Sequence, residues 1–245
     1  GIETIKSHVN PFGIPSVRVV EIPNQAQFHP LKYLRILMKE FVHSGGIFLE
    51  NCTVTSVVDK NGELVATTDK GSFHSRYLIY AINIPPDSNI MQVNNTPYHR
   101  YALALKLKNG NYPEALGYDL AKPYHSYRSH NIDGVDFLLA GGEGKKPENA
   151  DSASECFERL ENHIRQNFEV EEITYKWTTQ LYEPADGLPY IGQLPDSNGN
   201  VYCATGYNGD GMIFGTLAAR ILSEMISTGR SKYEKLFSPS RTLKQ

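Results

Sequence analysis

Apolar residues recur along the chain at two different periods, and each period predicts a different kind of element. Spacings of three and four residues predict helices over 30–43, 151–168 and 212–226. Short runs rich in β-branched and aromatic residues predict strands over 16–22, 47–58, 63–68, 72–82, 98–107, 135–140 and 201–205. The pattern therefore predicts a protein of mixed helix and sheet.

Turn signals join some of these elements and separate others. The polar turns at 59–62 and 69–71 connect three of the strands into a meander. Pro85 and Pro86 then break the pattern, and a tyrosine-rich composition follows to about residue 175. We read this stretch as an α+β insert, after which the chain returns to its first unit from Trp177 onward.

The helix over 151–168 carries its own start signal. Ser152 and Glu155 stand in the capping-box spacing, and apolar residues line one face of the helix that follows. A further glycine-rich stretch, 141–146, lacks the Lys-Ser or Lys-Thr ending of a phosphate-binding loop, and we expect it to form a surface turn.

A second glycine-rich turn, GYNGDGM at 206–212, lies between the strand over 201–205 and the last helix. A helix N-terminus presents free N–H groups and a partial positive charge, which suits an anion or an electron-rich carbonyl. Asn-Gly and Asp-Gly are also ordinary turn residues. The spacing alone is therefore equally consistent with a tight strand-to-helix connection.

Composition and charge exclude several classes of protein. The formal net charge is −3 and lysines and arginines form no cluster larger than a pair, which excludes nucleic acid as a partner. The three cysteines lie far apart without a CxxC motif, as buried thiols of a reducing compartment do. No apolar run has the length of a membrane span, and the first residues do not resemble a signal peptide. These features predict a cytoplasmic protein without a membrane partner.

The order of several phrases resembles FAD-dependent oxidoreductases of the D-amino-acid oxidase / glycine oxidase (DAO) superfamily. These phrases are FHPL at 28–31, GGIFLENCTVTSV at 45–57, YAIN at 80–83, DGLPYIG at 186–192, NVYCATGYNGDGM at 200–212 and GTLAARILSEMI at 215–226. The resemblance implies an α+β / α/β, FAD-linked reductase-like two-domain fold. It implies that 1–95 and 178–245 form a partial FAD-binding domain and that 96–177 form a substrate-binding-type α+β domain.

The resemblance also implies a set of cofactor-binding residues. Val54 would contact the adenine side of FAD through its backbone, and Ala81 would lie close to the same dinucleotide. The turn and helix start would cap the pyrimidine edge of the flavin, through Gly206, Gly209, Asp210, Gly211 and Met212. Their N–H groups would stabilise the negative charge that reduction leaves near N1 and the C2 carbonyl. We expect the Asp210 carboxylate to point to solvent.

The glycine motif that binds the pyrophosphate of a dinucleotide is absent. No GxGxxG follows a strand in this chain, whereas the family places that motif at its N-terminus. We therefore expect a truncated flavoprotein that lacks its N-terminal βαβ unit and is inactive as an isolated chain. Losing that unit would expose a sheet edge, so self-association through this edge is expected as well.

The substrate site departs from the family pattern. Amino-acid oxidases of the family carry a carboxylate-binding arginine just before the DGLPYIG phrase, and this chain has none there. Arg128 is a candidate replacement, with a surface or structural role as the alternative. Tyr182 and Tyr190 flank the phrase and either line the active site or pack. His125 and His130 are candidate acid–base groups or surface histidines, and no spacing predicts a metal site.

The function implied by the resemblance is hydride transfer from a C–H bond of a small-molecule amine or amino acid to flavin N5. Phrases such as PNQAQFHPLKYL at 23–34 and FSPSR at 237–241 resemble a bacterial subgroup in which a Rieske [2Fe–2S] iron–sulfur domain follows the flavin domain. The cluster ligands are absent here, so that domain would begin after Gln245. The alternative is a non-catalytic substrate or interaction module of a larger Rieske flavoprotein.

Overall fold

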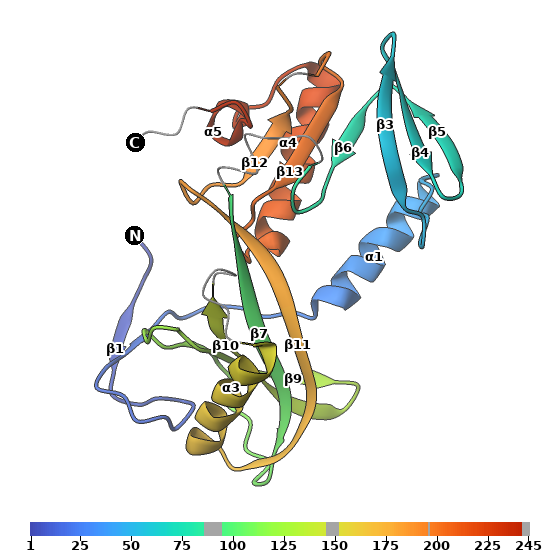
Figure 1. Ribbon diagram of the computed structural model, residues 1–245. Coiled ribbons are helices and arrows are strands. Elements are labelled where there is room, and N and C mark those ends of the chain that lie inside the picture. Colours follow the sequence, from blue (N-terminus) through green and yellow to red (C-terminus); the bar gives the residue numbers. More distant parts are fainter. Residues whose placement is uncertain (86–94, 146–151, 196, 242–245) are drawn as a thin grey trace. The chain divides into compact units, whose positions relative to one another are not determined.

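The computed structural model describes residues 1–85, 95–145, 152–195 and 197–241, and Figure 1 shows their helices and strands. They divide into two compact units. Unit 1 contains residues 1–27 and 97–180, and unit 2 contains residues 28–96 and 181–245. The prediction of a mixed α+β fold with two parts is confirmed.

The boundaries of the two units lie near the predicted domain boundaries at residues 95 and 177, with one difference. Residues 1–27 group with unit 1, because Phe12 is buried in the core of that unit beside Tyr127. The functional identity of each part, FAD-binding or substrate-binding, stays a prediction.

Unit 1 is built on a five-stranded sheet with strand order β11-β7-β10-β9-β8. Its strands are β7 (Asn95–Leu107), β8 (Leu116–Tyr118), β9 (Ser126–Ile132), β10 (Val135–Lys145) and β11 (Val170–Pro184), and a separate ribbon pairs β1 (Ile5–Ser7) with β2 (Val19–Glu21). Helix α3 (Ala153–Asn167) lies on this sheet (Figure 1). Its Leu160 and Ile164 join Leu103, Leu105 and Leu138 in one buried core.

Unit 2 contains two three-stranded sheets and the described helices other than α3. One sheet is the meander of β3 (Val54–Lys60), β4 (Glu63–Thr68) and β5 (Gly71–Ser75). The other consists of β12 (Tyr190–Gln193), β13 (Val201–Thr205) and β6 (Leu78–Tyr80), in the order β12-β13-β6. Its helices are α1 (Pro30–His43), α4 (Gly211–Thr228) and α5 (Glu234–Phe237). Helix α4 buries Ala218, Ile221 and Leu222 against β12 and β13.

The helices were predicted almost to the residue, whereas several strands were not. Residues 47–53 are irregular, and the strand predicted over 72–82 divides into β5 and β6, which belong to different sheets. Among the described strands, β1, β8, β9, β11 and β12 were missed. The surface turn predicted at 141–146 is wrong for residues 141–145, which continue β10; Lys146 lies outside the described residues. The break predicted at Pro85 and Pro86 is described only at Pro85, because Pro86 begins the stretch 86–94 outside the described residues.

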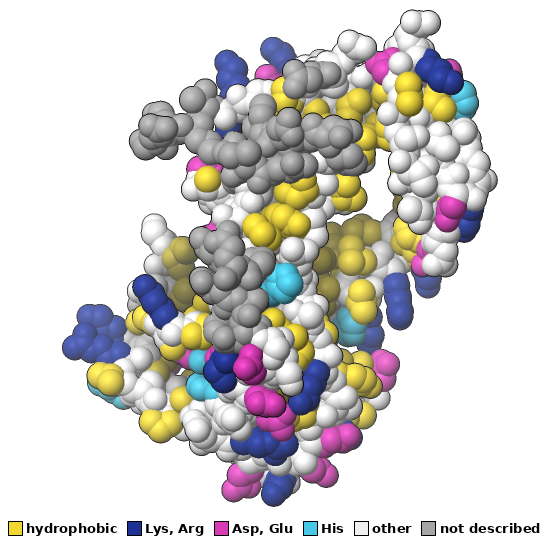
Figure 2. Space-filling model, in the orientation of Figure 1, with side chains coloured by type: hydrophobic (Ala, Val, Ile, Leu, Met, Phe, Trp, Pro, Cys, Tyr) yellow, Lys and Arg dark blue, Asp and Glu magenta, His cyan; other side chains and the backbone are white. Residues whose placement is uncertain are grey.

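Helix α1 exposes its apolar side chains instead of burying them. None of its residues is buried, and Ile36, Phe41 and Val42 are each more than half exposed. Hydrophobic side chains are visible at the surface over this helix and the neighbouring sheet in Figure 2. Within the described ranges, no helix combines the length and hydrophobicity that crossing a bilayer requires.

Candidate functional site

The glycine turn after β13 depends on glycine at its first position. Gly206 has φ +76°, in the left-handed region that favours glycine. A Cβ atom there would lie 2.8 Å from Cγ of Pro184 and 3.2 Å from Oδ1 of Asn95. The chain therefore turns tightly between neighbouring segments before α4 begins, and a side chain would not fit.

The start of α4 leaves backbone donors that no described protein group accepts. The Asp210 N–H donates to the Tyr207 carbonyl at 2.8 Å, and the Asp210 side chain makes no capping hydrogen bond. The hydrogen bonds of the described residues include none donated by the N–H groups of Gly209, Gly211 and Met212. These three donors, with the positive end of the helix dipole, form a site for an acceptor atom.

The predicted residue Ala81 lies at the same edge of the sheet as this turn. β6 and β13 are parallel, with Leu78 opposite Val201, so Ala81 and Gly206 both follow the carboxyl ends of their strands. The Thr205 hydroxyl donates to the Asn83 carbonyl and ties the two strand ends together. In α/β sheets ligands bind outside the carboxyl ends of parallel strands.

An arginine from the C-terminal segment fixes the DGLPYIG phrase. The Arg241 guanidinium binds both carboxylate oxygens of Asp186, at 2.7 and 2.8 Å, and donates to the carbonyls of Leu188 and Pro189. Its central carbon lies 3.8 Å from the centroid of the Tyr190 ring. These bonds hold the pKa of Asp186 below its usual value.

Three tyrosines near the turn differ in their burial. Tyr190 is 1% exposed, and its hydroxyl has no hydrogen-bond partner among the described residues; burial raises the pKa of this phenol. Burial raises the pKa of Tyr207 to about 12. Tyr182 is half-buried, and its carbonyl accepts the Asn208 N–H at 3.3 Å. Tyr182 and Tyr190 therefore flank the turn, and their catalytic role stays a prediction.

Two predicted residues lie in other elements. Val54 is the first residue of β3 and is 55% exposed, in the meander and not in the sheet that carries the turn. Arg128 belongs to β9 of unit 1, where burial lowers the pKa of its guanidinium. No described contact joins either residue to the turn, and both assignments stay predictions.

The histidines in unit 1 differ from the expected surface residues. His125 is buried, with 6% exposure, and His130 is half-buried. His125 lies with Asp119 and His163 in a cluster whose possible metal-ligand atoms are within 4.8 Å of one another. The sequence shows no ligand spacing there, because the three residues come from separate segments that only the fold brings together.

Sequence reasoning also missed the residues that support the turn. Pro184 and Asn95 pack against Gly206, and Arg241 binds a carboxylate 55 positions earlier in the chain. A proline or an arginine carries no local signal of such a distant contact. The arginine in FSPSR was noticed only as part of a resembling phrase.

The residues at this edge fit the carbonyl edge of a flavin. Three N–H groups are available as donors, glycines keep the approach open, and the exposed side chain of Asp210 does not bring its negative charge inward. The pyrophosphate-binding motif is not among the 245 residues of this sequence.

Two bacterial proteins are similar to this chain. It is 28% identical over 233 residues to the Bacillus subtilis protein YhfW, whose name describes a Rieske 2Fe-2S iron-sulfur protein; the match covers 94% of this chain and 46% of YhfW. It is 25% identical over 222 residues to OrdL of Haemophilus influenzae, named as a probable oxidoreductase; the match covers 83% of this chain and 48% of OrdL. The chain thus spans about half the length of these relatives.

Solved structures show the same fold. NikD, an amino acid oxidase of nikkomycin biosynthesis, has 17% identity and a TM-score of 0.69, over 86% of this chain and 60% of that one. L-proline dehydrogenase from P. horikoshii has 17% identity and a TM-score of 0.65, over 86% and 59%. Glycine oxidase from Geobacillus kaustophilus has 15% identity and a TM-score of 0.65, over 83% and 55%. At these identities the likeness establishes the fold alone.

The family follows from the extent of a further match. The family model described as FAD dependent oxidoreductase (DAO) matches residues 6–225, which is most of the chain and includes elements of both units. This chain belongs to the DAO family of FAD-dependent oxidoreductases.

Proposed function

We propose that this chain is the C-terminal part of the flavin module of an FAD-dependent amine or amino-acid oxidoreductase. The single observation that supports this most strongly is the set of unused N–H donors of Gly209, Gly211 and Met212 at the carboxyl edge of β6 and β13. A preorganised donor set of this kind stabilises charge that develops on an acceptor. Membership of the DAO family supplies the identity of the cofactor.

Each part of the turn has a defined task in this proposal. Bound FAD supplies a hydride acceptor at N5 for a substrate C–H bond. Gly209, Gly211 and Met212 hold the carbonyl edge of the flavin, and the dipole of α4 adds positive potential there. Asp210 is a cap residue and not a donor, because its N–H is already bonded to Tyr207. Val54 and Ala81 are proposed to contact the dinucleotide.

The first experiment compares the visible spectrum of this chain with that of a version extended at its N-terminus to include any GxGxxG segment. We expect the flavin colour only in the longer protein, because the pyrophosphate site is not in this sequence. Absence of colour in both, even with added FAD, would overturn the flavin proposal.

A substitution at the first position of α4 tests the donor set itself. Gly211→Pro removes one N–H at a helix position that accepts proline, whereas Gly211→Ala keeps it, and a Cβ there would make only an ordinary contact with Tyr207 at 3.6 Å. Gly211→Pro should lose one hydrogen bond to FAD, worth about 1 kcal/mol, and should therefore bind FAD about fivefold more weakly than Gly211→Ala. Equal FAD affinity in both variants of the longer protein would show that the Gly211 N–H does not bind the flavin.

The substrate class rests on a different residue. We propose that Arg128 binds a substrate carboxylate, supported by the lack of an arginine in the segment before Asp186. Arg128→Lys in the longer protein would then raise KM for amino acids and leave KM for amines without a carboxylate unchanged. Equal effects on both classes would assign Arg128 a structural role.

Similarity to YhfW supports a Rieske [2Fe–2S] domain in the full protein. Iron and sulfide analysis of the full-length protein tests this, and a protein without iron would exclude it.

The bacterial relatives support a bacterial source. The free thiols of Cys52, Cys156 and Cys203 support a cytoplasmic location, which a thiol count on freshly isolated protein checks.

A second candidate function is a non-catalytic interaction module. The exposed apolar side chains of α1 favour it, because a large apolar surface in a soluble protein marks a contact with another chain or segment. The colour test separates the two functions, since an interaction module stays colourless in every length of protein.

A further inference from the structure

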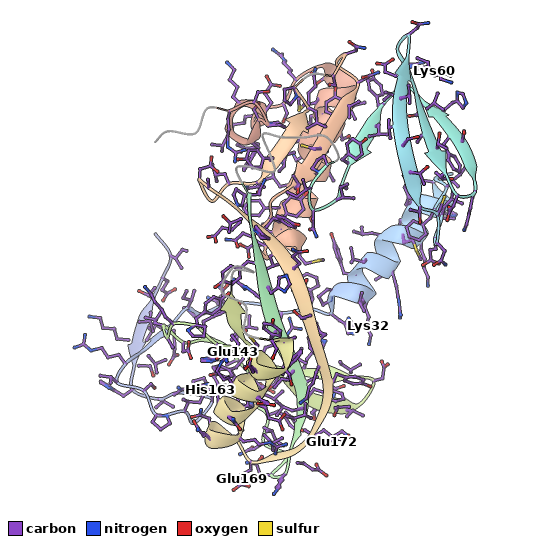
Figure 3. All side chains as sticks on the ribbon, in the orientation of Figure 1. Lys32, Lys60, Glu143, His163, Glu169 and Glu172 are labelled. Atoms are coloured by element: carbon purple, nitrogen blue, oxygen red, sulfur yellow. The ribbon has the colours of Figure 1, made fainter. Side chains whose placement is uncertain are left out.

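Four ionisable side chains meet under helix α3 in unit 1, away from the glycine turn in the sequence. Asp119 follows β8, His125 precedes β9, Glu143 lies in β10 and His163 lies in α3. Figure 3 labels Glu143 of β10 and His163 of α3. His125 and Glu143 are buried, and such a cluster calls for a physical reason because burying charge is costly unless it is compensated.

The first pair in this cluster fixes the proton on His125. Asp119 Oδ2 lies 2.7 Å from His125 Nδ1, and Asp119 Oδ1 accepts the backbone N–H groups of Ala121 and His125. The carboxylate is therefore held in place and accepts the Nδ1 proton. In metal-binding histidines a carboxylate on one ring nitrogen sets the tautomer and leaves the lone pair on the other.

The other nitrogen of His125 has no hydrogen-bond partner. Its Nε2 is buried and unbonded among the described residues, in a side chain that is 8% exposed. Its nearest carboxylate atom is Glu143 Oε1 at 3.8 Å, while Glu143 Oε2 is held by Arg159 Nε at 2.7 Å. The unbonded Nε2 and the Oε1 atom are thus neighbours, separated by more than a hydrogen-bond distance.

The width of this gap suits an ion better than a direct hydrogen bond. A hydrogen bond needs a separation of about 3 Å. Two zinc bonds of about 2.1 Å at a tetrahedral angle hold their donor atoms about 3.4 Å apart, and a wider angle of about 130° spans 3.8 Å. A small inward shift of either side chain therefore gives a metal-binding distance.

His163 completes the cluster only after its ring turns. Its ring stacks on His125 with 3.7 Å between centroids and 7° between planes, and its Nε2 lies 2.5 Å from the Tyr127 hydroxyl. Imidazole lone pairs lie in the ring plane, so two parallel stacked rings do not direct their nitrogens at one ion. Rotation about the terminal torsion of His163, which is soft, would turn a nitrogen toward the gap.

We propose that His125 Nε2, Glu143 Oε1 and His163 bind one divalent transition-metal ion such as Zn²⁺. Asp119 orients the His125 ring. Imidazole and carboxylate are ligands that zinc prefers, and solvent supplies the remaining position. Such an ion would fix α3 to the sheet through residues of β10, the β9 entry and the helix. It would be a structural site, independent of the flavin.

The test is a zinc titration of the whole 245-residue chain after chelator treatment, followed by calorimetry and metal analysis. The test variants are His125→Gln and Glu143→Gln. The control variant is His74→Gln, which removes the histidine of an exposed His–Glu pair in β4 and β5, 3.1 Å from Glu63. We expect one Zn²⁺ per chain in the wild type and the control, at least 100-fold weaker binding in both test variants, and 10- to 100-fold weaker binding in Asp119→Asn.

Thermal unfolding gives a further readout. Zinc should raise the Tm of the wild type by several degrees, because an ion that binds only the folded state stabilises it. The proposal is overturned if the wild type takes up no stoichiometric zinc between pH 6 and 8.5, or if both test variants, folded by circular dichroism, bind it as the control does.

Discussion

Gly206 is the residue on which the geometry of the turn depends most directly. Gly206→Ala would place a side chain in the left-handed region, at about 1–2 kcal/mol, and 2.8 Å from Pro184 Cγ. With the clash included, we expect a loss of about 2–4 kcal/mol in the free energy of unfolding, measured by urea denaturation.

The matched control lies nine positions along, within α4. A Cβ at Gly215 would meet nothing within 4 Å, and its φ is not positive. Gly215→Ala should therefore stabilise the protein by about 0.5–1 kcal/mol, as alanine does in a helix interior. A Gly206→Ala protein as stable as Gly215→Ala would show that the turn tolerates a side chain.

The ion pair of Arg241 and Asp186 gives a prediction about pH. Hydrogen bonds from Arg241 lower the pKa of Asp186 from 3.8 in the folded state, so the pair stabilises the fold above about pH 4 and loses this effect as the pH falls through the lower folded value. Asp186→Asn should cost about 2 kcal/mol at pH 7, with a smaller difference from wild type near pH 2. Denaturation midpoints at several pH values measure this.

An exposed ion pair serves as the comparison. Arg220 and Glu224 are one helical turn apart in α4, with the arginine side chain 73% exposed. Arg220→Gln should change stability far less than Asp186→Asn does. An equal cost for the two substitutions would mean that Asp186 is no better held than a surface carboxylate.

Residues of the candidate site were predictable where their role is local. The glycines of the turn and the start of α4 follow from the order of residues alone, because φ > 0 and a helix start are local properties. The clamp of Arg241 on Asp186 and Tyr190 was not predictable, since it joins segments about 50 residues apart. The same holds for His125, whose burial depends on Glu143 and α3.

At the scale of elements, the N-terminus of α3 offers a direct test. The Ser152 hydroxyl accepts the Glu155 N–H at 3.3 Å, and the Glu155 carboxylate accepts the Ser152 N–H at 2.7 Å. Ser152→Ala should cost about 1 kcal/mol. Ser154→Ala, in the same turn but outside the capping box, should change stability by less than about 0.5 kcal/mol; similar losses in thermal unfolding would contradict the cap.

Helices were predicted better than strands because their signals are local. α3 has a capping box, and α4 ends at Gly229 in the left-handed conformation, so both boundaries are written in neighbouring residues. β11 runs for 15 residues with mostly exposed positions and no clean alternation. Its extent depends on its partner β7, which a local pattern does not reveal.

At the scale of the whole molecule, unit 2 is expected to associate with itself. β6 is the last strand of its sheet among the described residues, and Ile79 is 45% exposed. An unpaired edge beside exposed apolar surface pairs with another chain. Light scattering should therefore show a mean mass that rises with concentration, and Ile79→Lys should suppress this rise by placing a charge on the edge.

The control for this experiment is a lysine in the other unit. Val20 lies in β2 of unit 1 and is 63% exposed. Val20→Lys adds the same charge without touching the β6 edge, so its mass should follow that of the wild type. A monomer at every concentration in the wild type would exclude association through β6.

The two compact units resemble the predicted domains in outline and differ from them at residues 1–27. The composition change after residue 85 and the return near Trp177 fall close to the observed boundaries. The placement of residues 1–27 was missed, because it depends on Phe12 entering the core beside Tyr127. A single apolar residue in a polar segment does not show which core it joins.

The parallel pairing of β6 with β13 has a consequence for the order in which the protein folds during synthesis. Tyr80 pairs with Cys203, so about 120 residues must be translated after β6 before its neighbour exists. At about 5–20 residues per second this interval is roughly 6–24 s. During it, unit 2 consists only of its first segment, and residues 97–180 are completed before β13 and can fold first. The nascent chain therefore holds β6 without its β13 partner for seconds, which is long enough for a chaperone to bind it.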